Sequence, residues 1–252
     1  MHYHWNWAIF LQGSTNPNET WLAYLVSGLG WTLATALCAW AIALSVGAAI
    51  GTLRTAGGRF VAVLCAAWVE IFRNIPLLVQ MFLWFFVLPE LVPEQWGDAI
   101  KQMPPPWAAF VPAVLCLGFY TSIRIAEQVR AGIQSLPRGQ MMAATALGLR
   151  RAQAYRYVIL PVTFRIILPP LTSEFMNCLK NSSVALTIGL LELTGRAKAM
   201  QEFTFQVFEA FAAATLIYLV TNVIIVFGMR RLERKVRVPG FLGAANVQVT
   251  GH

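Results

Sequence analysis

The sequence predicts an all-α membrane protein with about five transmembrane helices. Of its 252 residues, 58% are hydrophobic and only 12% carry a charge, and the mean hydropathy is +0.60. Such values lie outside the usual range of soluble domains. The charges also fall in short blocks between long apolar runs, which is typical of a chain that crosses a bilayer several times.

Five apolar segments approach or exceed the length of about 20 residues that a helix needs to cross the hydrocarbon core of a membrane. They comprise residues 25–53, 61–88, 108–129, 164–191 and 209–230. Pro76 lies in the second segment and Pro169-Pro170 in the fourth, so we expect both spans to be kinked or locally broken. The loop from Pro89 to Trp107 contains a run of three prolines, which favours a stiff surface segment over another helix.

The distribution of Lys and Arg predicts the orientation of these spans, because cytoplasmic loops are enriched in both. With the N-terminus outside, most of the 19 basic residues fall in cytoplasmic segments, and the outer segments hold only Lys101, Arg196 and Lys198. The outer acidic residues are then Glu19, Glu90, Glu94, Asp98, Glu192, Glu202 and Glu209. We therefore expect an outer N-terminal segment (1–24), a transmembrane domain (25–230) with a cytoplasmic loop at about 130–163, and a cytoplasmic tail (231–252).

The chain has no recognisable motif for nucleotide binding or catalysis. It contains neither a Gly-x-x-x-x-Gly-Lys-Ser/Thr loop nor a Gly-rich dinucleotide turn. Its three histidines lie at the termini, and its four cysteines lie apart within apolar runs, which argues against a metal site. We expect no cofactor in this chain, and no nucleic acid partner, because the basic residues do not gather along one face. Energy for any transport would come from another subunit.

A long basic loop separates the third and fourth spans. It contains Met142-Ala-Ala, then Gly148 after three residues, and Val158-Ile-Leu-Pro161 after nine more. The alanines predict a short helix over residues 140–149. Gly148 predicts a turn or a close contact, and Pro161 is suited to the first turn of the next span.

This spacing resembles the coupling loop of the membrane subunits of ATP-binding-cassette importers, with the pattern Glu-Ala-Ala, three residues, Gly, nine residues, Ile-x-Leu-Pro. Met142 stands where the family has glutamate, and methionine supplies packing but no ion pair within the loop. The resemblance implies that the loop fits a cleft in a separate ATPase subunit, which carries ATP and Mg. The residues that it assigns to coupling are Gln140, Met142, Ala143, Ala144, Leu147, Gly148, Leu160 and Pro161.

Three further stretches narrow the resemblance to permeases for polar amino acids, namely residues 70–80, 127–140 and 174–183. Trp5-Asn-Trp and Leu232 to Gly240 look most like the glutamate/aspartate branch. The resemblance covers most of residues 27–240. It implies the type I importer permease fold in a bacterial inner membrane, with the N-terminal segment in the periplasm. The implied partners are two ATPase subunits, a second homologous permease subunit, expected as a hetero-pair, and a periplasmic substrate-binding protein.

Charged residues inside the spans are candidates for function, because charge in lipid is costly. Glu70 and Arg73 lie three residues apart on one helix, and we expect them either to neutralise each other or to contact substrate. Arg124 is expected near the cytoplasmic mouth, where its side chain reaches water.

The fourth span carries polar residues at helical spacing, which predicts a shared polar face. This face is expected either to form a hydrogen-bonded seam between two permease subunits or to line the translocation path. For an acidic substrate, Lys180 and Arg73 would contact carboxylates and Glu174 the ammonium group. The candidates for the substrate path are Glu70, Arg73, Glu174, Asn177, Lys180, Asn181, Ser182 and Ser183.

These features favour a non-catalytic permease subunit of an ATP-driven importer of polar, acidic amino acids. An ion-coupled secondary amino acid transporter, without an ATPase, is the main alternative, because intramembrane charges suit it as well. A membrane-embedded assembly or receptor component without a transport path is a third class. The length of the basic loop argues against the second class, and the polar fourth span argues against the third.

Overall fold

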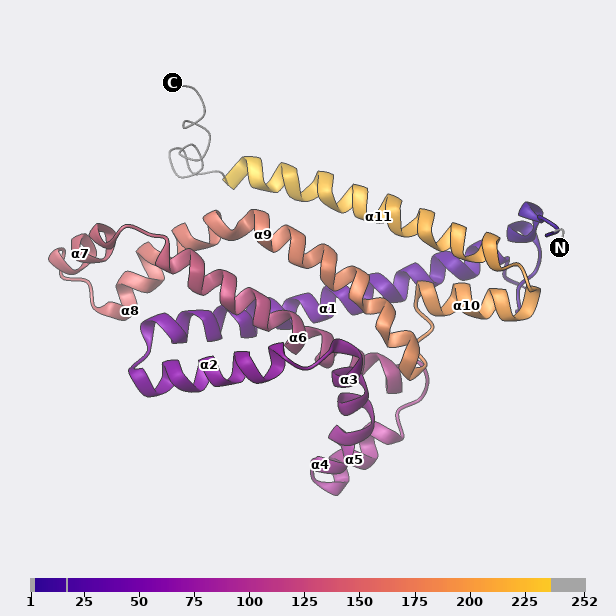
Figure 1. Cartoon of the computed structure of the whole chain (residues 1–252), viewed down its shortest axis with the longest axis horizontal. Coiled ribbons are helices and arrows are strands. Elements are labelled where there is room, and N and C mark those ends of the chain that lie inside the picture. The colour runs from indigo at the N-terminus through magenta and orange to yellow at the C-terminus, as the bar shows by residue number, and fades with distance from the viewer. Residues whose placement is uncertain (1–2, 17, 237–252) are drawn as a thin grey trace. The chain divides into compact units, whose positions relative to one another are not determined.

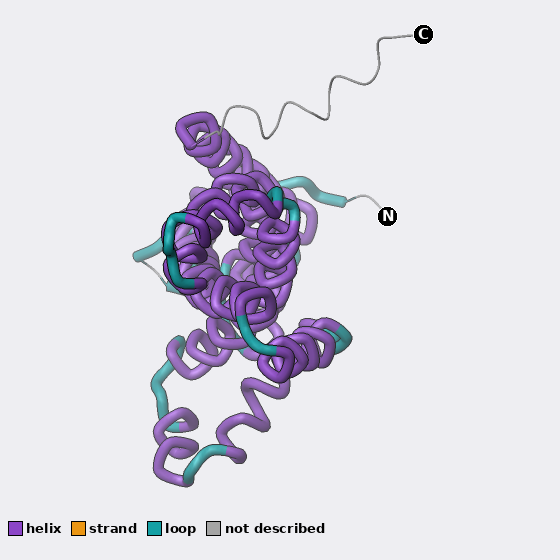
Figure 2. The backbone as a smooth tube through the Cα atoms, turned by 90° about the vertical axis from the view of Figure 1, so that its left-hand side faces the viewer, coloured by secondary structure: helices purple, strands orange, loops and turns teal. Residues whose placement is uncertain are grey.

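The computed structural model describes residues 3–16 and 18–236, and this part of the chain is helical, without a strand (Figures 1 and 2). Its longest elements are α1 (Trp21–Ala56), α6 (Trp107–Gln134), α11 (Val207–Val236) and a helical run over Arg151–Ile188. These four are long and apolar enough to cross a membrane. Two shorter helical segments between α1 and α6, Arg59–Arg73 and Leu77–Leu91, are bent by 100° at the break between them, and they raise the number to five if they form one span. The predicted all-α class with about five spans is confirmed.

The second predicted span is broken at Pro76, as expected. Helix α2 (Arg59–Arg73) ends before Asn74, and Pro76 precedes the first residue of α3 (Leu77–Phe82). Proline lacks an amide hydrogen and disfavours a helical conformation of the residue before it, so the break falls where the sequence places it. A π-helical turn, η2 (Leu83–Val87), and α4 (Leu88–Leu91) complete this span.

In the fourth span, Pro169 and Pro170 lie inside α9 (Leu160–Asn181) without breaking it, so of the two expected outcomes the break does not occur and the kink stays a prediction. Each proline removes one backbone hydrogen bond, and an apolar helix packed among others tolerates this loss, as α6 does at Pro112. The irregular turns lie at the two ends of α9. The short α8 (Arg151–Ala154) and a π-helical turn, η3 (Tyr155–Ile159), precede it, and the 3-10 helix η4 (Ser182–Ile188) follows.

The loop after α4 contains a helix, α5 (Glu94–Lys101), where the run of three prolines predicts a stiff segment without one. Pro93 directly precedes the first turn of α5, where the missing amide hydrogen costs nothing. The ammonium group of Lys101 lies 2.7 Å from the Glu90 carboxylate, and this hydrogen bond raises the pKa of Lys101. The expectation of a helix-free segment between Pro89 and Trp107 was therefore wrong.

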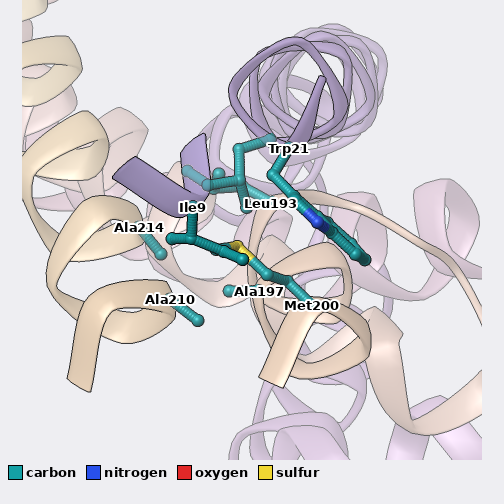
Figure 3. Packing of buried hydrophobic residues seen from close by; sticks show 8 residues of the cluster. Ile9, Trp21, Leu193, Ala197, Met200, Ala210 and Ala214 are labelled. Atoms are coloured by element: carbon teal, nitrogen blue, oxygen red, sulfur yellow. The ribbon is translucent and has the colours of Figure 1, made fainter. Parts of the chain in front are cut away.

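The helices form two compact units, which we describe separately. Unit 1 comprises Met1–Ile42, Ile75–Tyr120 and Phe175–Ile224, and unit 2 comprises Ala43–Asn74, Thr121–Glu174 and Ile225–His252. Helix α11 continues beyond residue 230 to Val236, and the rest of the predicted tail lies outside the described residues. In unit 1, one core cluster joins η1 (Trp7–Leu11), α1, α10 (Leu193–Thr204) and α11 (Figure 3).

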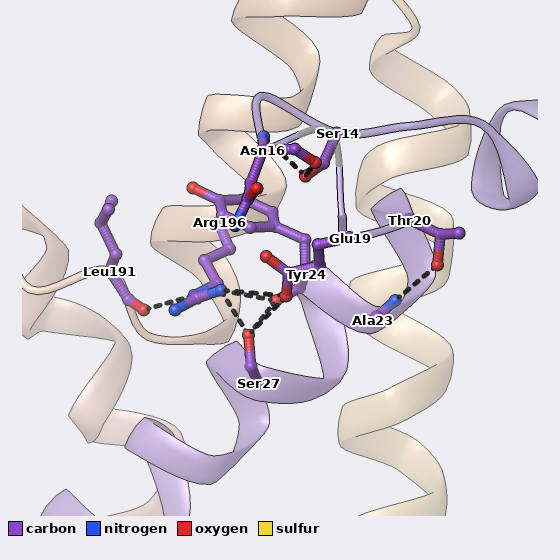
Figure 4. Close-up of polar contacts among 9 residues, drawn as sticks. All are labelled: Ser14, Asn16, Glu19, Thr20, Ala23, Tyr24, Ser27, Leu191 and Arg196. Atoms are coloured by element: carbon purple, nitrogen blue, oxygen red, sulfur yellow. Dashed lines mark hydrogen bonds and ion pairs between the residues drawn. The ribbon is translucent and has the colours of Figure 1, made fainter.

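Charged side chains also connect the helices of unit 1. The Arg196 guanidinium on α10 donates to the carbonyl oxygens of Tyr24 (3.0 Å) and Leu191 (3.1 Å) and to the Ser27 hydroxyl (Figure 4). Glu192 and Glu209 are fully buried. The sequence did not predict this burial, because local hydrophilicity does not show what a folded chain places around a residue; the assignment of both glutamates to the outer side stays a prediction.

In unit 2, α1 and α6 approach closely through two glycines. A Cβ atom on Gly47 would lie 2.6 Å from the Ser122 carbonyl oxygen, and one on Gly51 would lie 2.5 Å from that of Ala126. Both distances are too short for a side chain. Small residues four positions apart allow this kind of close helix contact in membranes.

Candidate functional site

The predicted coupling helix exists as α7 (Arg138–Ala146) in unit 2, slightly earlier than the expected range of 140–149. Its end is set by Gly148, whose φ of +79° lies in the left-handed region. The Gly148 amide donates to the Thr145 carbonyl (2.9 Å) and the Leu149 amide to that of Ala144 (3.1 Å). This pair of bonds is a Schellman motif, which satisfies carbonyl groups at the helix end. The predicted turn at Gly148 is confirmed.

Helix α7 has an attached face and an open face. Ala144 is buried, and Met141 packs against a cluster that contains Leu136, Tyr155 and Ile159. In contrast, Met142 is 66% exposed and Leu147 is 82% exposed. Ala143 is also exposed. The open face therefore presents these apolar side chains beside the exposed Arg138 and Thr145.

The remaining predicted coupling residues lie at the edges of this helix and beyond it. Gln140 is half-buried in the first turn of α7, and Leu160 packs against the cluster around Tyr155. Pro161 is exposed near the start of α9, but the helical run has already begun at Arg151. Pro161 therefore does not start the span, because the π-helical turn η3 carries the helix through from α8.

An ion-pair network that the sequence did not reveal lies where α1 and α6 approach α7. The Glu127 carboxylate accepts hydrogen bonds from the Arg54 guanidinium and from Arg130 Nε, the latter at 2.9 Å. Arg130 also donates to the Gln134 side chain at 2.7 Å. Arg54 and Gln134 line a cavity of about 560 Å³ that Met141 of α7 also lines. The spacing of Glu127, Arg130 and Gln134 predicts that they share one helix face. Their partner Arg54 lies on α1, far away in the sequence, and could not be predicted in this way.

Glu70 and Arg73 form the ion pair that their spacing allowed, with an N–O distance of 2.9 Å. The Asn74 side-chain amide donates to the Glu70 carbonyl oxygen at 2.7 Å, where α2 ends. Both charged side chains are exposed in the single chain. The pair thus occupies the last turn before the break in this span.

Arg124 and Glu174 form a second pair in unit 2, between α6 and α9. Arg124 Nη1 lies 3.7 Å from Glu174 Oε1, and the side chains are 52% and 12% exposed respectively. The expectation that Arg124 simply reaches water missed this partner, because the two residues are far apart in sequence. A half-exposed cation beside a mostly buried carboxylate presents both signs of charge, as recognition of an amino acid requires.

The other candidates on the fourth span belong to unit 1. Lys180 is exposed, and Asn177, Asn181 and Ser183 are half-buried. Ser182 is fully buried, and its hydroxyl donates to the Leu179 carbonyl at 2.7 Å. The Ser183 hydroxyl donates to the Lys180 carbonyl at 2.8 Å, so both hydroxyls have backbone partners where α9 changes to η4.

The family model for "Binding-protein-dependent transport system inner membrane component" matches residues 41–238 of this chain. The glutamate/aspartate import permease protein GltJ of Escherichia coli (strain K12) is 48% identical over 244 residues, which are 96% of this chain and 99% of GltJ. The probable glutamine ABC transporter permease protein GlnM of Bacillus subtilis (strain 168) is 34% identical, over 83% of this chain and 92% of its own.

Two solved structures share the fold. An amino acid ABC transporter crystallised with histidines has 32% identity and a TM-score of 0.72, over 85% of this chain and 95% of its own. The MetNI methionine ABC transporter, in an inward-facing conformation, has a TM-score of 0.71 at 20% identity, over 85% of this chain and 97% of its own. The second likeness concerns the fold alone.

Proposed function

This chain belongs to the binding-protein-dependent transport system inner membrane components, and we propose that it is the permease subunit of an ATP-driven importer of glutamate and aspartate. The observation that carries this substrate class is the 48% identity to the Escherichia coli glutamate/aspartate permease over 96% of this chain. As a member of this family, it is a transmembrane component that is not itself catalytic. Membership of this family argues against the two alternative functions, an ion-coupled secondary transporter and a receptor component without a transport path.

In this proposal, α7 is the element through which an ATPase subunit moves the permease. Its open face supports this role, because Met142, Ala143 and Leu147 are exposed while Ala144 and Met141 attach the helix to the chain. Met142 gives this face an apolar side chain where the family pattern has a carboxylate. The contact surface on the ATPase should therefore be apolar opposite Met142.

The complete importer would contain two ATPase subunits that bind ATP and Mg, a second and different permease subunit, and a periplasmic substrate-binding protein. The excess of Lys and Arg at the C-terminal ends of α1 and α11 and between α6 and α9 supports a periplasmic N-terminus and a cytoplasmic α7 and C-terminus. The chain would thus cross a bacterial inner membrane.

Charged residues of the spans are proposed to recognise the substrate. An acidic amino acid carries two carboxylates and one ammonium group, so its path needs cations and an anion. In unit 2, Arg124 and Glu174 supply one of each, 3.7 Å apart, and Arg73 supplies another cation beside Glu70. In unit 1, Lys180 supplies an exposed ammonium group, and Asn177 and Asn181 supply amides.

Uptake by the reconstituted complex tests this function. Proteoliposomes that contain this chain, its second permease, the ATPase and the binding protein would receive labelled glutamate, aspartate, glutamine or arginine. We expect ATP-dependent uptake of glutamate and aspartate, and no uptake with an ATPase variant that cannot hydrolyse ATP. Preference for glutamine or arginine would overturn the substrate class, and uptake on an ion gradient without ATP would overturn the mechanism.

A further inference from the structure

Two stacked tryptophans are exposed in the segment before α1. The rings of Trp5 and Trp7 lie 5.7 Å apart with an interplanar angle of 8°. The two residues are 59% and 55% exposed. This segment precedes residues 41–238, to which the family model applies. A pair of indoles in such a position marks a surface for an apolar or interfacial partner.

The segment is held in place by a buried carboxylate. Glu209, in the first turn of α11, is fully buried. One of its oxygens accepts the backbone amide of Asn6 at 2.8 Å, and the other accepts the hydroxyl of Tyr3. The Tyr3 ring meets Trp5 and Phe208 edge-on, with centroid distances of 4.9 Å and 4.8 Å. Through these two hydrogen bonds, Glu209 holds the segment that contains Trp5 and Trp7 against the start of α11.

The same segment is also anchored by an apolar residue. Ile9, in η1, is buried in the cluster that contains Met200, Ala210 and Ala214 (Figure 3). With Ile9 pointing into this core, the segment has a defined orientation. In this orientation Ile9 is buried, whereas Trp5 and Trp7 of the same segment are exposed.

The surface next to the tryptophans is the exposed stripe of α11. Exposed positions recur there as adjacent pairs every four residues, at 207–208, 211–212, 215–216, 219–220 and 223–224. The stripe contains one polar side chain, Thr215, and no charged one, since Glu209 is buried. The most apolar window of α11 has a mean hydropathy of 2.2, and only 11% of it is buried. In a membrane component, such a face meets the hydrocarbon of lipids.

We propose that residues 3–11, the N-terminal anchor, lie in the lipid headgroup layer at the end of the α11 stripe, with Glu209 as the positioning residue. The anchor continues the lipid-facing surface, because Phe208 of the stripe contacts both Tyr3 and Trp5. Indole rings favour the headgroup layer, where the ring is shielded and its N–H group finds water or headgroup oxygens. The non-helical backbone at residues 3–6 also needs this hydrated layer, since hydrocarbon leaves such groups unpaired.

Fluorescence quenching by brominated lipids tests the location of the anchor. The assembled complex would be placed in nanodiscs of phosphatidylcholine brominated either near the headgroup or near the end of the acyl chains. Subtracting the spectrum of the double variant Trp5→Phe/Trp7→Phe isolates these two indoles from the other tryptophans. We expect the difference signal to lose most of its intensity with shallow bromines, less with deep bromines, and little with iodide in the water.

Other quenching patterns would overturn the proposal. Strong quenching by iodide with none by bromolipid would place the anchor in water. Protection from both quenchers would place it against another subunit, and protection that appears only after the substrate-binding protein is added would assign it to that protein. Substrate uptake is measured separately, so a failure of the proposed amino acid specificity does not affect this test.

Two variants test the role of Glu209. Each is made both with Trp5 and Trp7 present and with both replaced by Phe, so that the same difference signal can be measured. With Glu209→Ala, we expect quenching by shallow bromines to fall and quenching by iodide to rise, because both hydrogen bonds to the anchor are lost. Tyr3→Phe removes the hydroxyl that contacts Glu209 and also the Gln206 side chain (2.8 Å), but keeps the bond from the Asn6 amide to Glu209, so it should shift quenching in the same direction by less. Glu202→Ala is the control, because Glu202 is an exposed residue of α10 that pairs with Lys198 at 3.6 Å.

The two variants also separate positioning from folding. Size-exclusion chromatography and thermal unfolding would show which variant complexes remain assembled. Unchanged quenching in an assembled Glu209→Ala complex would overturn the positioning role. If Glu209→Ala does not assemble, Tyr3→Phe decides, and unchanged quenching in that variant overturns the role in the same way.

Discussion

Helices α10 and α7 are both short connections between longer helices, but they differ in how their ends are satisfied. At α10, Glu192 is the N-cap, and its carboxylate accepts the Gly195 amide at 2.8 Å and the Tyr218 hydroxyl at 2.9 Å. The Thr32 hydroxyl lies 3.2 Å from the same carboxylate. At α7, no side chain caps the first turn, and Met142 and Leu147 are exposed.

This difference separates a helix whose first turn is capped within its own unit from a helix with an open face. The Glu192 cap of α10 finds its donors within unit 1. Helix α7 is attached by one face and leaves Met142 and Leu147 exposed, as the proposed contact with an ATPase subunit requires. Exposure of apolar residues in a defined helix is more informative here than the amino acid types alone.

The largest effect is expected for Glu192→Ala, which removes the acceptor shared by three donors in the interior of unit 1. Buried donors without an acceptor are costly, so we expect a loss of about 3 kcal/mol in the free energy of unfolding. Thermal unfolding of the purified complex would show a lower midpoint. The exposed Glu202→Ala serves as the control, and an unchanged midpoint for Glu192→Ala would show that α10 does not depend on this cap.

Gly28→Ala should have the next largest effect, because α1 and α10 touch at this glycine. A Cβ atom on Gly28 would lie 2.7 Å from Arg196 Cδ and 3.1 Å from Leu193 Cα. We expect a destabilisation of about 2 kcal/mol from overpacking. Gly30→Ala, in the same helix but facing open space, is the matched control. Equal unfolding midpoints for the two variants would contradict the close contact.

Leu147→Asp concerns α7, the second helix of the comparison, and should weaken binding of the ATPase subunit without affecting folding. Leu147 is exposed, so its replacement should leave the unfolding midpoint nearly unchanged. A charge on the open face of α7 should weaken the ATPase contact by about tenfold, which is about 1.4 kcal/mol. Titration of the ATPase subunit onto the permease would measure this change. Full affinity would show that α7 docks through another face.

Gly148→Ala should have the smallest effect of the four. Alanine at a φ of +79° is strained, so we expect the end of α7 to lose about 1 kcal/mol of stability. Hydrogen exchange at residues 145–149 would detect the weakened turn. Gly139→Ala, inside α7 and facing open space, should have no such cost and provides the comparison. Equal exchange in both variants would argue against the strained turn.

Much of the fold could be predicted because membrane spans are local features. Each span is recognised from the hydropathy of one continuous segment, and Pro76 and Gly148 act on the backbone beside them. The short helix α7 was predicted in the same way, from alanines and a glycine within a few residues. A local break at Pro169-Pro170, one of the two outcomes expected there, does not occur, because the tolerance of a proline depends on what surrounds the helix.

The sequence by itself determined the number of spans and the place of α7, because both follow from residues that are neighbours in the chain. Tertiary structure decided which charges are buried and paired, as with Glu192 and Tyr218, Glu127 and Arg54, or Glu174 and Arg124. These partners lie on different helices, and their meeting depends on the register and rotation of the packed helices. The polar residues of α9 were visible in the sequence, but only the folded chain separates the buried hydroxyl of Ser182 from the exposed amine of Lys180.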